Sequence, residues 1–318
     1  MTNISLFDLQ NSVIDPNAFA KLEDYFLICR ALLNLFESAK PTRIVSPTDH
    51  NYMFYQYDGN YGHKITRPIN TDLFIERSRD FKAAFGRFES FLEDVRRYQD
   101  ASSRQRSINN YCLTNEVNKV VYTIQQSIGC IGDSFENPNQ SRKRIGQLFE
   151  LFTKIIIRKL GLECESRNIT IPIPGFDGYT MSYELDLVIS RNKAVITAET
   201  NLIHPVEVVG SVKTTSKDRI DKIFLDKHIL TKLLGRDIPV IAIFLHDVQR
   251  AKKGNSIFGV NSTFKSNHFL GYTVSLNKLD GVYYIDPRPI MVENTRLQEQ
   301  IRDFQQFLVR DVWTLTNR

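Results

Sequence analysis

The sequence predicts an α/β protein (α+β) in which a central mixed β-sheet is flanked by helices and preceded by a mainly helical region. Up to about residue 135, apolar residues recur every three or four positions, which is the period of amphipathic helices. After Ser141, helical patterns alternate with short apolar runs such as IPVIAIFL (238–245), which is typical of strands buried on both faces. We therefore divide the chain into a helical region, 1–135, and an α/β domain, 136–318.

The helical region contains three predicted helices with apolar stripes. They cover 17–38, a segment that follows Thr71 and continues to about Val95, and 114–127. Pro41 ends the first of them. We interpret the aromatic side chains along these stripes as core. The segment GDSFENPNQ (132–140) has the composition of a loop or linker.

The α/β domain begins with a helix that we expect to be capped by Ser141 and to end at Gly161. A second amphipathic helix starts at Arg219 and ends at Gly235, and a final helix is expected near 292–308. The expected strands are 167–173, 181–190, 204–213, 238–245, 269–276 and 281–287. The first two are joined by the turn sequence PGFDG.

Composition sets limits without giving function. The chain has 318 residues, 42% of them hydrophobic, which is enough for one large or two modest domains. No run of 18 apolar residues occurs, and the first residues lack the pattern of a secretory signal, so we expect neither a membrane span nor export. The four cysteines are widely separated and predict reduced thiols rather than a disulfide framework or a zinc site. A formal charge of +5 permits an anionic partner without requiring one.

The most informative residues lie on two of the expected strands. Asp186 lies in YELDLVIS, and Glu184, two positions earlier, should share its face. In VEVVGSVK, Ser211 and Lys213 share a face by the same alternation. A carboxylate beside a lysine suits phosphodiester hydrolysis, because the carboxylate can hold Mg²⁺ and the lysine can orient water or stabilise charge on the phosphate.

One carboxylate is too few for Mg²⁺, and two helical acids are candidates to join it. Asp226 lies thirteen residues after Lys213, and Glu150 lies in the helix before the first strand. Both occupy largely apolar segments, where an unpaired carboxylate is costly. Each also has an ordinary alternative as a helical ion pair, Asp226 with Lys222 and Glu150 with Lys154. Asp186 and Lys213 have the bland alternative of being exposed strand residues.

In this order of elements the chain resembles the PD-(D/E)xK nuclease superfamily. The usual acid-x-lysine motif here is Ser211-Val212-Lys213, and Leu185 replaces the nominal proline, which resembles the restriction endonucleases of the CCGG and CCNGG group. The resemblance spans roughly 140–250 and implies a restriction-endonuclease-like core. It also implies roles: Asp186 as metal ligand, Lys213 as catalytic lysine, Asp226 as displaced acid and metal ligand, Glu150 as accessory acid, and Ser211 in place of the usual acid.

The same group carries a basic-acidic-basic triplet that contacts C:G pairs, and the resemblance assigns that part to Lys217, Asp218 and Arg219. Arginine and lysine donate to guanine, and aspartate accepts from cytosine. Other basic clusters are candidates for phosphate contacts, although each alone is more often a solvated surface. They are Arg96-Arg97, Arg104-Arg106, Arg142-Lys143-Arg144 and Arg250-Lys252-Lys253.

The resulting hypothesis is a type II restriction endonuclease that makes Mg²⁺-dependent double-strand cuts at a short, palindromic, C:G-containing DNA site. A two-fold target implies a homodimer, with tetramers open, and the helical region would clamp DNA or build the dimer. We expect a cytoplasmic protein of a bacterium or an archaeon with no small-molecule cofactor. Two alternatives stay open: a repair or structure-specific nuclease of the same fold, and a DNA-binding module that has lost catalysis.

Overall fold

The computed structural model describes residues 4–98 and 113–317. It contains two compact units, each assembled from separate stretches of chain. Unit 1 comprises 4–91, 113–152 and 248–263, and unit 2 comprises 92–98, 153–247 and 264–317. Helices α3 (Ser78–Arg97) and α6 (Pro138–Lys159) each run from one unit into the other. These units divide the chain differently from the predicted regions 1–135 and 136–318, whose proposed roles in DNA clamping or dimerisation and in catalysis stay predictions.

Unit 1 is helical around the buried helix α5 (Glu116–Asp133), against which α1 (Leu6–Ile14) and α2 (Leu22–Ala39) pack. It also contains an antiparallel sheet that the sequence did not reveal, in the order β1 (Thr42–Val45), β2 (Tyr52–Gln56), β3 (Ile69–Asn70), with a 3₁₀ turn, η1 (Gly59–Tyr61), after β2. These strands are short, and β2 is buried on both faces, so no alternation marks it.

Unit 2 is organised by a six-stranded mixed sheet in the order β11-β10-β7-β6-β5-β4. The strands β4 (Glu163–Pro172), β5 (Thr180–Ser190) and β6 (Val208–Thr215) pair antiparallel. From β6 onward the pairing is parallel, through β7 (Val240–His246), β10 (Gly281–Asp286) and β11 (Ile301–Asp303). Strand β7 is buried at every position, which confirms the sequence interpretation of IPVIAIFL.

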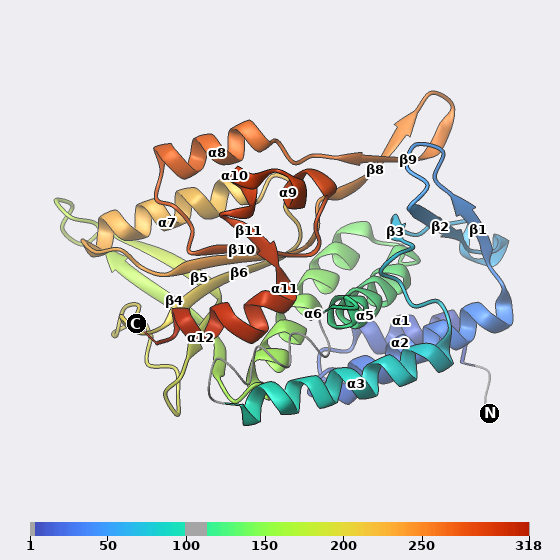
Figure 1. Ribbon diagram of the computed structural model, residues 1–318, viewed down its shortest axis with the longest axis horizontal. Coiled ribbons are helices and arrows are strands. Elements are labelled where there is room, and N and C mark those ends of the chain that lie inside the picture. The colour runs from blue at the N-terminus through green and yellow to red at the C-terminus, as the bar shows by residue number, and fades with distance from the viewer. Residues whose placement is uncertain (1–3, 99–112, 318) are drawn as a thin grey trace. The chain divides into compact units, whose positions relative to one another are not determined.

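Helices cover both faces of this sheet, and Figure 1 shows the layers. One face carries α7 (Ile220–Leu234), α8 (Ser266–Ser275), α9 (Pro289–Glu293) and α10 (Thr295–Gln298), whose Phe224, Phe269, Met291 and Leu297 share a core with alternate residues of β7 and β10. The other face carries α11 (Phe304–Gln306), the π-helical turn η3 (Phe307–Asp311) and α12 (Val312–Leu315). There the Phe307 ring lies 4.8 Å from that of Tyr283. The predicted α/β class, a central mixed sheet flanked by helices, is therefore correct.

Two elements near the C-terminus differ from prediction. The segment 269–276, expected as a strand, lies mostly in helix α8, because Phe269 and Tyr272 are one helical turn apart and both pack on Phe224. The single helix expected at 292–308 is broken into shorter elements. Asn294 caps α10 by accepting from Arg296 N, and 301–303 then pair with β10 as strand β11.

Helix ends and cysteines test smaller predictions. Helix α6 starts at Pro138 and is capped by Asn137, which accepts from the backbone N of residues 139 and 140, so Ser141 is not its cap. Gly161 and Gly235 both adopt positive φ after their helices, as expected. Cys29, Cys130 and Cys164 are free and buried, whereas Cys112 lies outside the described residues. Among the described residues, no helix combines the length and apolar character needed to span a bilayer.

Candidate active site

Asp186 lies in a β-bulge of β5, where that strand pairs with the edge strand β4. Glu165 on β4 pairs with Val188 on β5, and Arg167 pairs with Leu185. Two residues along β4 therefore face three residues along β5. The extra residue of β5 therefore falls at Asp186 and Leu187. The Ser166 hydroxyl, itself contacted by the Lys154 ammonium, donates to the carbonyl oxygen of Asp186 at 3.0 Å and ties the bulge to β4.

The bulge turns Asp186 toward β6. Its Oδ2 accepts from the Ser211 hydroxyl at 2.9 Å, from the Val212 backbone N at 3.0 Å and from the Lys213 ammonium at 2.5 Å. The antiparallel register, Leu187 with Gly210, brings Asp186 and Ser211 opposite each other at the next step. The structure thus brings together Asp186, Ser211 and Lys213.

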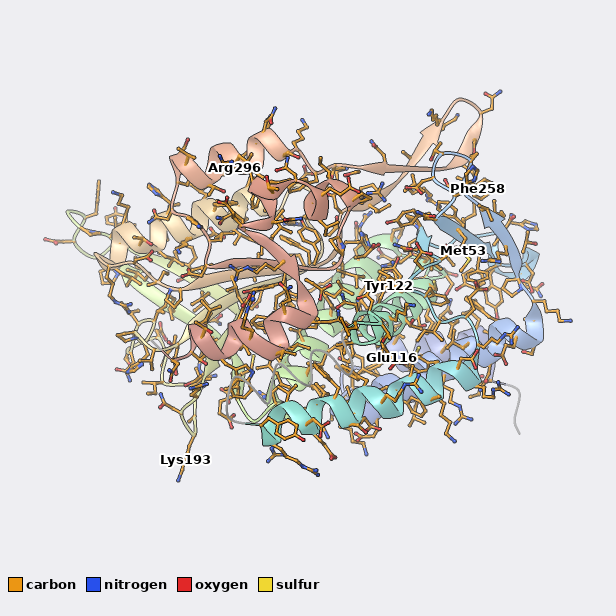
Figure 2. All side chains as sticks on the ribbon, viewed as in Figure 1. Met53, Glu116, Tyr122, Lys193, Phe258 and Arg296 are labelled. Carbon is orange, nitrogen blue, oxygen red and sulfur yellow. The ribbon has the colours of Figure 1, made fainter. Side chains whose placement is uncertain are left out.

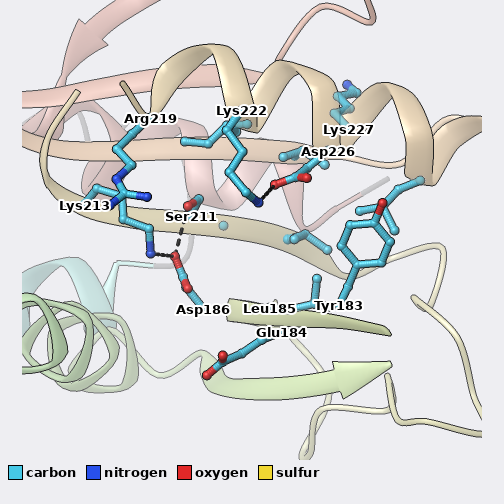
Figure 3. Close-up of a pocket in the computed structure, with 15 residues that line it drawn as sticks. Tyr183, Glu184, Leu185, Asp186, Ser211, Lys213, Arg219, Lys222, Asp226 and Lys227 are labelled. Atoms are coloured by element: carbon cyan, nitrogen blue, oxygen red, sulfur yellow. Dashed lines mark hydrogen bonds and ion pairs between the residues drawn. The ribbon is translucent and has the colours of Figure 1, made fainter. Parts of the chain in front are cut away.

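Glu184 does not join Asp186, which corrects the expectation that the two share a face. Figure 3 shows the Glu184 side chain pointing away from Asp186, toward the side of β4. The reason is the bulge, because an extra residue breaks the period-two alternation from which the shared face was deduced.

A pocket of about 180 Å³ lies between these strands and helix α7. Its lining includes Asp186, Ser211 and Lys213 from the strands and Asp226 from α7. Three carboxylates and four cations line it: Glu184, Asp186, Asp226, Lys213, Arg219, Lys222 and Lys227.

Asp226 is paired with Lys222 on its own helix. Asp226 Oδ2 lies 2.6 Å from the Lys222 ammonium, so the bland pairing foreseen from the sequence is present. The Lys222 side chain is 64% exposed, so this solvated ion pair stabilises the position of the Asp226 carboxylate only weakly. Partial burial and, second, the charge of Asp226 raise the pKa of Tyr183 on β5. Figure 3 shows Asp226 on the wall of the pocket across from Asp186.

The carboxylates present suit a magnesium ion that is completed by substrate. No group of three or more His, Cys, Asp or Glu side chains is arranged for a metal within 4–98 and 113–317. Mg²⁺, however, is commonly held by only one or two protein carboxylates, together with water and phosphate oxygens. Asp186 and Asp226 line one pocket, and the hydrogen bonds of Asp186 described above all fall on Oδ2, which leaves Oδ1 for a ligand.

The remaining predicted residues lie elsewhere. Glu150 is a partly buried residue of α6 within unit 1, whereas the pocket is built from unit 2. Lys217, Asp218 and Arg219 are exposed and form the turn between β6 and α7, where Asp218 adopts φ +52°. Of these three, Arg219 reaches the pocket lining (Figure 3).

Sequence reasoning missed the residue that holds this turn in place. Asp247 is fully buried, and its carboxylate accepts from the Ser216 hydroxyl and the Phe264 backbone N, both at 2.9 Å. Ser216 immediately precedes the exposed triplet, so Asp247 fixes where that triplet begins. The available signal was an acid placed directly after the buried strand IPVIAIFLH, at a position where a polar side chain has to find a partner.

Comparison with known proteins identifies the fold. No family model and no curated protein matches the chain. Among solved structures, the Type IIP restriction endonuclease Kpn2I superposes with a TM-score of 0.68 at 18% identity, over 98% of this chain and 97% of that one. A complex of the restriction endonuclease PspGI with substrate DNA matches with a TM-score of 0.40 at 14% identity, over 76% of this chain and 93% of that one. The chain therefore has a restriction-endonuclease fold over nearly its whole length.

Proposed function

We propose that this protein is a type II restriction endonuclease that makes Mg²⁺-dependent double-strand cuts at a short, palindromic, C:G-containing DNA site. The observation that carries the proposal is the contact of 2.5 Å between the Lys213 ammonium and the Asp186 carboxylate, inside a pocket that Asp226 also lines. The fold shared with Kpn2I supports it at the level of architecture.

The roles proposed for the side chains follow from their chemistry. Asp186 and Asp226 would hold Mg²⁺, and Asp226 would exchange Lys222 for the metal. When bound, Mg²⁺ polarises the scissile phosphate and lowers the pKa of a water molecule. Lys213 would orient the attacking water and stabilise negative charge on the phosphate. Ser211 holds Asp186 by a hydrogen bond without adding a charge, so the second carboxylate comes from α7.

Glu150 keeps its proposed role as an accessory acid, which requires the α6 side chain to reach the same phosphate. Base recognition is assigned to the exposed turn before α7. Arg219 and Lys217 would donate to guanine and Asp218 would accept from cytosine. A palindromic site is matched by a two-fold protein, so we propose a homodimer with one pocket for each strand.

The test is digestion of phage-length duplex DNA with Mg²⁺, followed by sequencing of the fragment ends. A type II restriction endonuclease gives discrete fragments whose ends share one sequence. A smear, or cutting confined to junctions, would indicate a nuclease with other work. Protein that shifts DNA in a gel and never nicks it, with Mg²⁺ or Mn²⁺, would indicate a binding module.

Variants assign the chemistry to residues. Asp186→Ala and Lys213→Ala should abolish cleavage and leave specific binding intact. Asp177→Ala is the matched control for Asp186, because it removes an exposed aspartate from the turn between β4 and β5, outside the pocket lining. Lys193→Ala is the control for Lys213, since Lys193 is exposed on the loop after β5 and projects outward (Figure 2). Equal loss in variant and control would remove the proposed roles.

A further inference from the structure

The hairpin formed by β8 (Val248–Lys253) and β9 (Ser256–Ser262) carries unopposed positive charge. Between residues 248 and 263 the sequence has three cations, Arg250, Lys252 and Lys253, and no acidic residue. All three side chains are exposed, and none forms an ion pair or hydrogen bond with the described part of the chain. They fall within three residue steps of one strand, a length of about 10 Å.

The hairpin is a well-defined element of unit 1, with a tight turn and a β-bulge. Its two-residue turn has Gly254 at φ +58°, the position at which such turns favour glycine. Ala251 pairs with Gly259 and Lys253 pairs with Ser256, so two residues along β8 face three along β9 and the hairpin has a β-bulge there. At Gly259 a Cβ would lie 2.2 Å from the Ala251 carbonyl oxygen, so the close approach of the strands requires glycine.

One side of the hairpin is anchored to the β1–β2 sheet. The Ser46 hydroxyl donates to Phe258 O at 2.8 Å, and Thr48 Oγ1 accepts from Val260 N at 2.8 Å. The Phe258 ring packs edge-on against Phe54 with centroids 5.6 Å apart. Figure 1 shows the hairpin as an extended ribbon beside β1 and β2, and Figure 2 shows Phe258 near Met53 of β2. The anchoring contacts come from β9, whereas the cations lie on β8.

Each of the other basic clusters within the described residues has at least one cation occupied by an internal contact. Arg144 donates to Val13 O at 2.7 Å and to Asp15 O at 2.6 Å. Arg142 donates to Asn139, and Arg97 pairs with Glu93 on its own helix. Arg104 and Arg106 lie outside the described residues. Among the described clusters, the hairpin is therefore the one whose cations are all available to an external anion.

We infer that the β8–β9 hairpin is a DNA-contacting arm whose Arg250, Lys252 and Lys253 bind backbone phosphates outside the catalytic pocket. This inference rests on the proposed function and adds a second contact surface, on unit 1. Each DNA strand carries one negative charge per about 3.4 Å of axis, so a stretch of about 10 Å presents roughly three phosphates of one strand to the three cations. The contact is independent of sequence, because phosphates are common to all sites.

The test compares two triple variants of equal charge. The arm variant is Arg250→Gln, Lys252→Gln, Lys253→Gln. The control variant is Lys82→Gln, Lys159→Gln, Lys193→Gln, which removes three exposed cations on other elements that likewise lack partners within the described chain. Binding to a random-sequence duplex is measured against salt concentration without Mg²⁺, so that no cleavage intervenes.

For each protomer bound to the duplex, the arm variant should reduce the slope of log affinity against log salt by about 2.7, which is about 0.9 for each phosphate that the arm no longer neutralises. Between about 50 and about 200 mM salt, the parent and control should therefore lose about 40-fold more affinity than the arm variant for each protomer bound. An arm variant with the parental slope, or a control with the same reduction as the arm variant, would overturn the inference.

Digestion separates this inference from the proposed function. At low salt the arm variant should still give the same fragments as the parent, because its pocket is unchanged. If the parent gives no discrete fragments but the slopes differ as stated, the proposed function fails and the arm survives. If the parent cuts and the slopes coincide, the arm fails alone.

Discussion

The buried ion pair between Lys227 and Asp280 should determine the stability of the helix that carries Asp226. Lys227, the next residue on α7, has a side chain only 2% exposed, and its ammonium lies 2.7 Å from Asp280 Oδ2 and 2.6 Å from Lys278 O. Asp280 Oδ2 also accepts from Val240 N at 2.9 Å, at the start of β7. This one carboxylate therefore joins helix α7 to the central sheet.

Asp280→Ala removes the carboxylate and leaves the Lys227 ammonium buried with the Lys278 carbonyl oxygen and with the more distant, exposed Asp237 carboxylate. Breaking a buried pair from one side costs about 3–5 kcal/mol, because an uncompensated charge remains. Lys227 also lies 3.6 Å from Asp237, whose side chain is 62% exposed, and Asp237→Ala should cost less than about 1 kcal/mol. Adding Lys227→Met to Asp280→Ala should recover part of the loss, since the stranded charge is gone.

Urea denaturation followed by circular dichroism measures these differences in the free energy of unfolding. The order of stability should be parent, Asp237→Ala, the double variant, and then Asp280→Ala. If Asp280→Ala costs no more than Asp237→Ala, the buried pair is not what holds α7 to the sheet.

Three further predictions concern the turn before α7 and the thiols. Arg219→Ala should cost about 1–3 kcal/mol of discrimination between the cognate site and a site with one changed C:G pair, measured as a ratio of cleavage rates, and an unchanged ratio would remove its role as a reader. Asp247→Asn keeps the shape of the side chain and weakens its hydrogen bonds with the Ser216 hydroxyl and the Phe264 backbone N. It should therefore lower site discrimination more than it lowers binding to random duplex. Equal effects would show that Asp247 does not position the turn. In a Cys112→Ser variant no thiol should react rapidly with a disulfide reagent at pH 8, because Cys29, Cys130 and Cys164 are buried and burial raises the pKa of Cys164 to about 12. One fast-reacting thiol per chain would contradict this.

The sequence predicted the α/β architecture and the meeting of Asp186, Ser211 and Lys213, because these depend on local periodicity and on strands that are near neighbours in the chain. It was wrong about Glu184, since the bulge that turns Asp186 toward β6 depends on pairing with β4 and has no local pattern. It was also wrong about 269–276, where β-branched and aromatic residues favour a strand in isolation and packing on Phe224 favours a helix.

The sequence did not predict the roles of Asp247 and of the hairpin 248–263, because both depend on contacts between residues far apart in the chain. Asp247 resembles an ordinary loop acid until Ser216 and Phe264, far from it in sequence, are seen to converge on its carboxylate. The hairpin 248–263 lies within the segment assigned to the α/β domain, yet its contacts are with Ser46, Thr48 and Phe54. In both cases the partner is separated by many residues, and hydrophobic periodicity carries no information about it.

The proposed function requires Asp186 and Asp226 to bind one divalent cation, although Asp226 pairs with Lys222 in this structure. The most direct measurement is the rate of plasmid cleavage as a function of Mg²⁺ concentration for the parent, Asp226→Asn and Asp221→Asn. Asp221 is the matched control, an exposed aspartate in the first turn of the same helix. Asp226→Asn should need far more Mg²⁺ and should be at least about 100-fold slower at a concentration that saturates the parent, because one of the two proposed carboxylate ligands is removed. Asp221→Asn should match the parent. Cleavage by Asp226→Asn with the parental Mg²⁺ dependence would show that Asp226 is not a metal ligand.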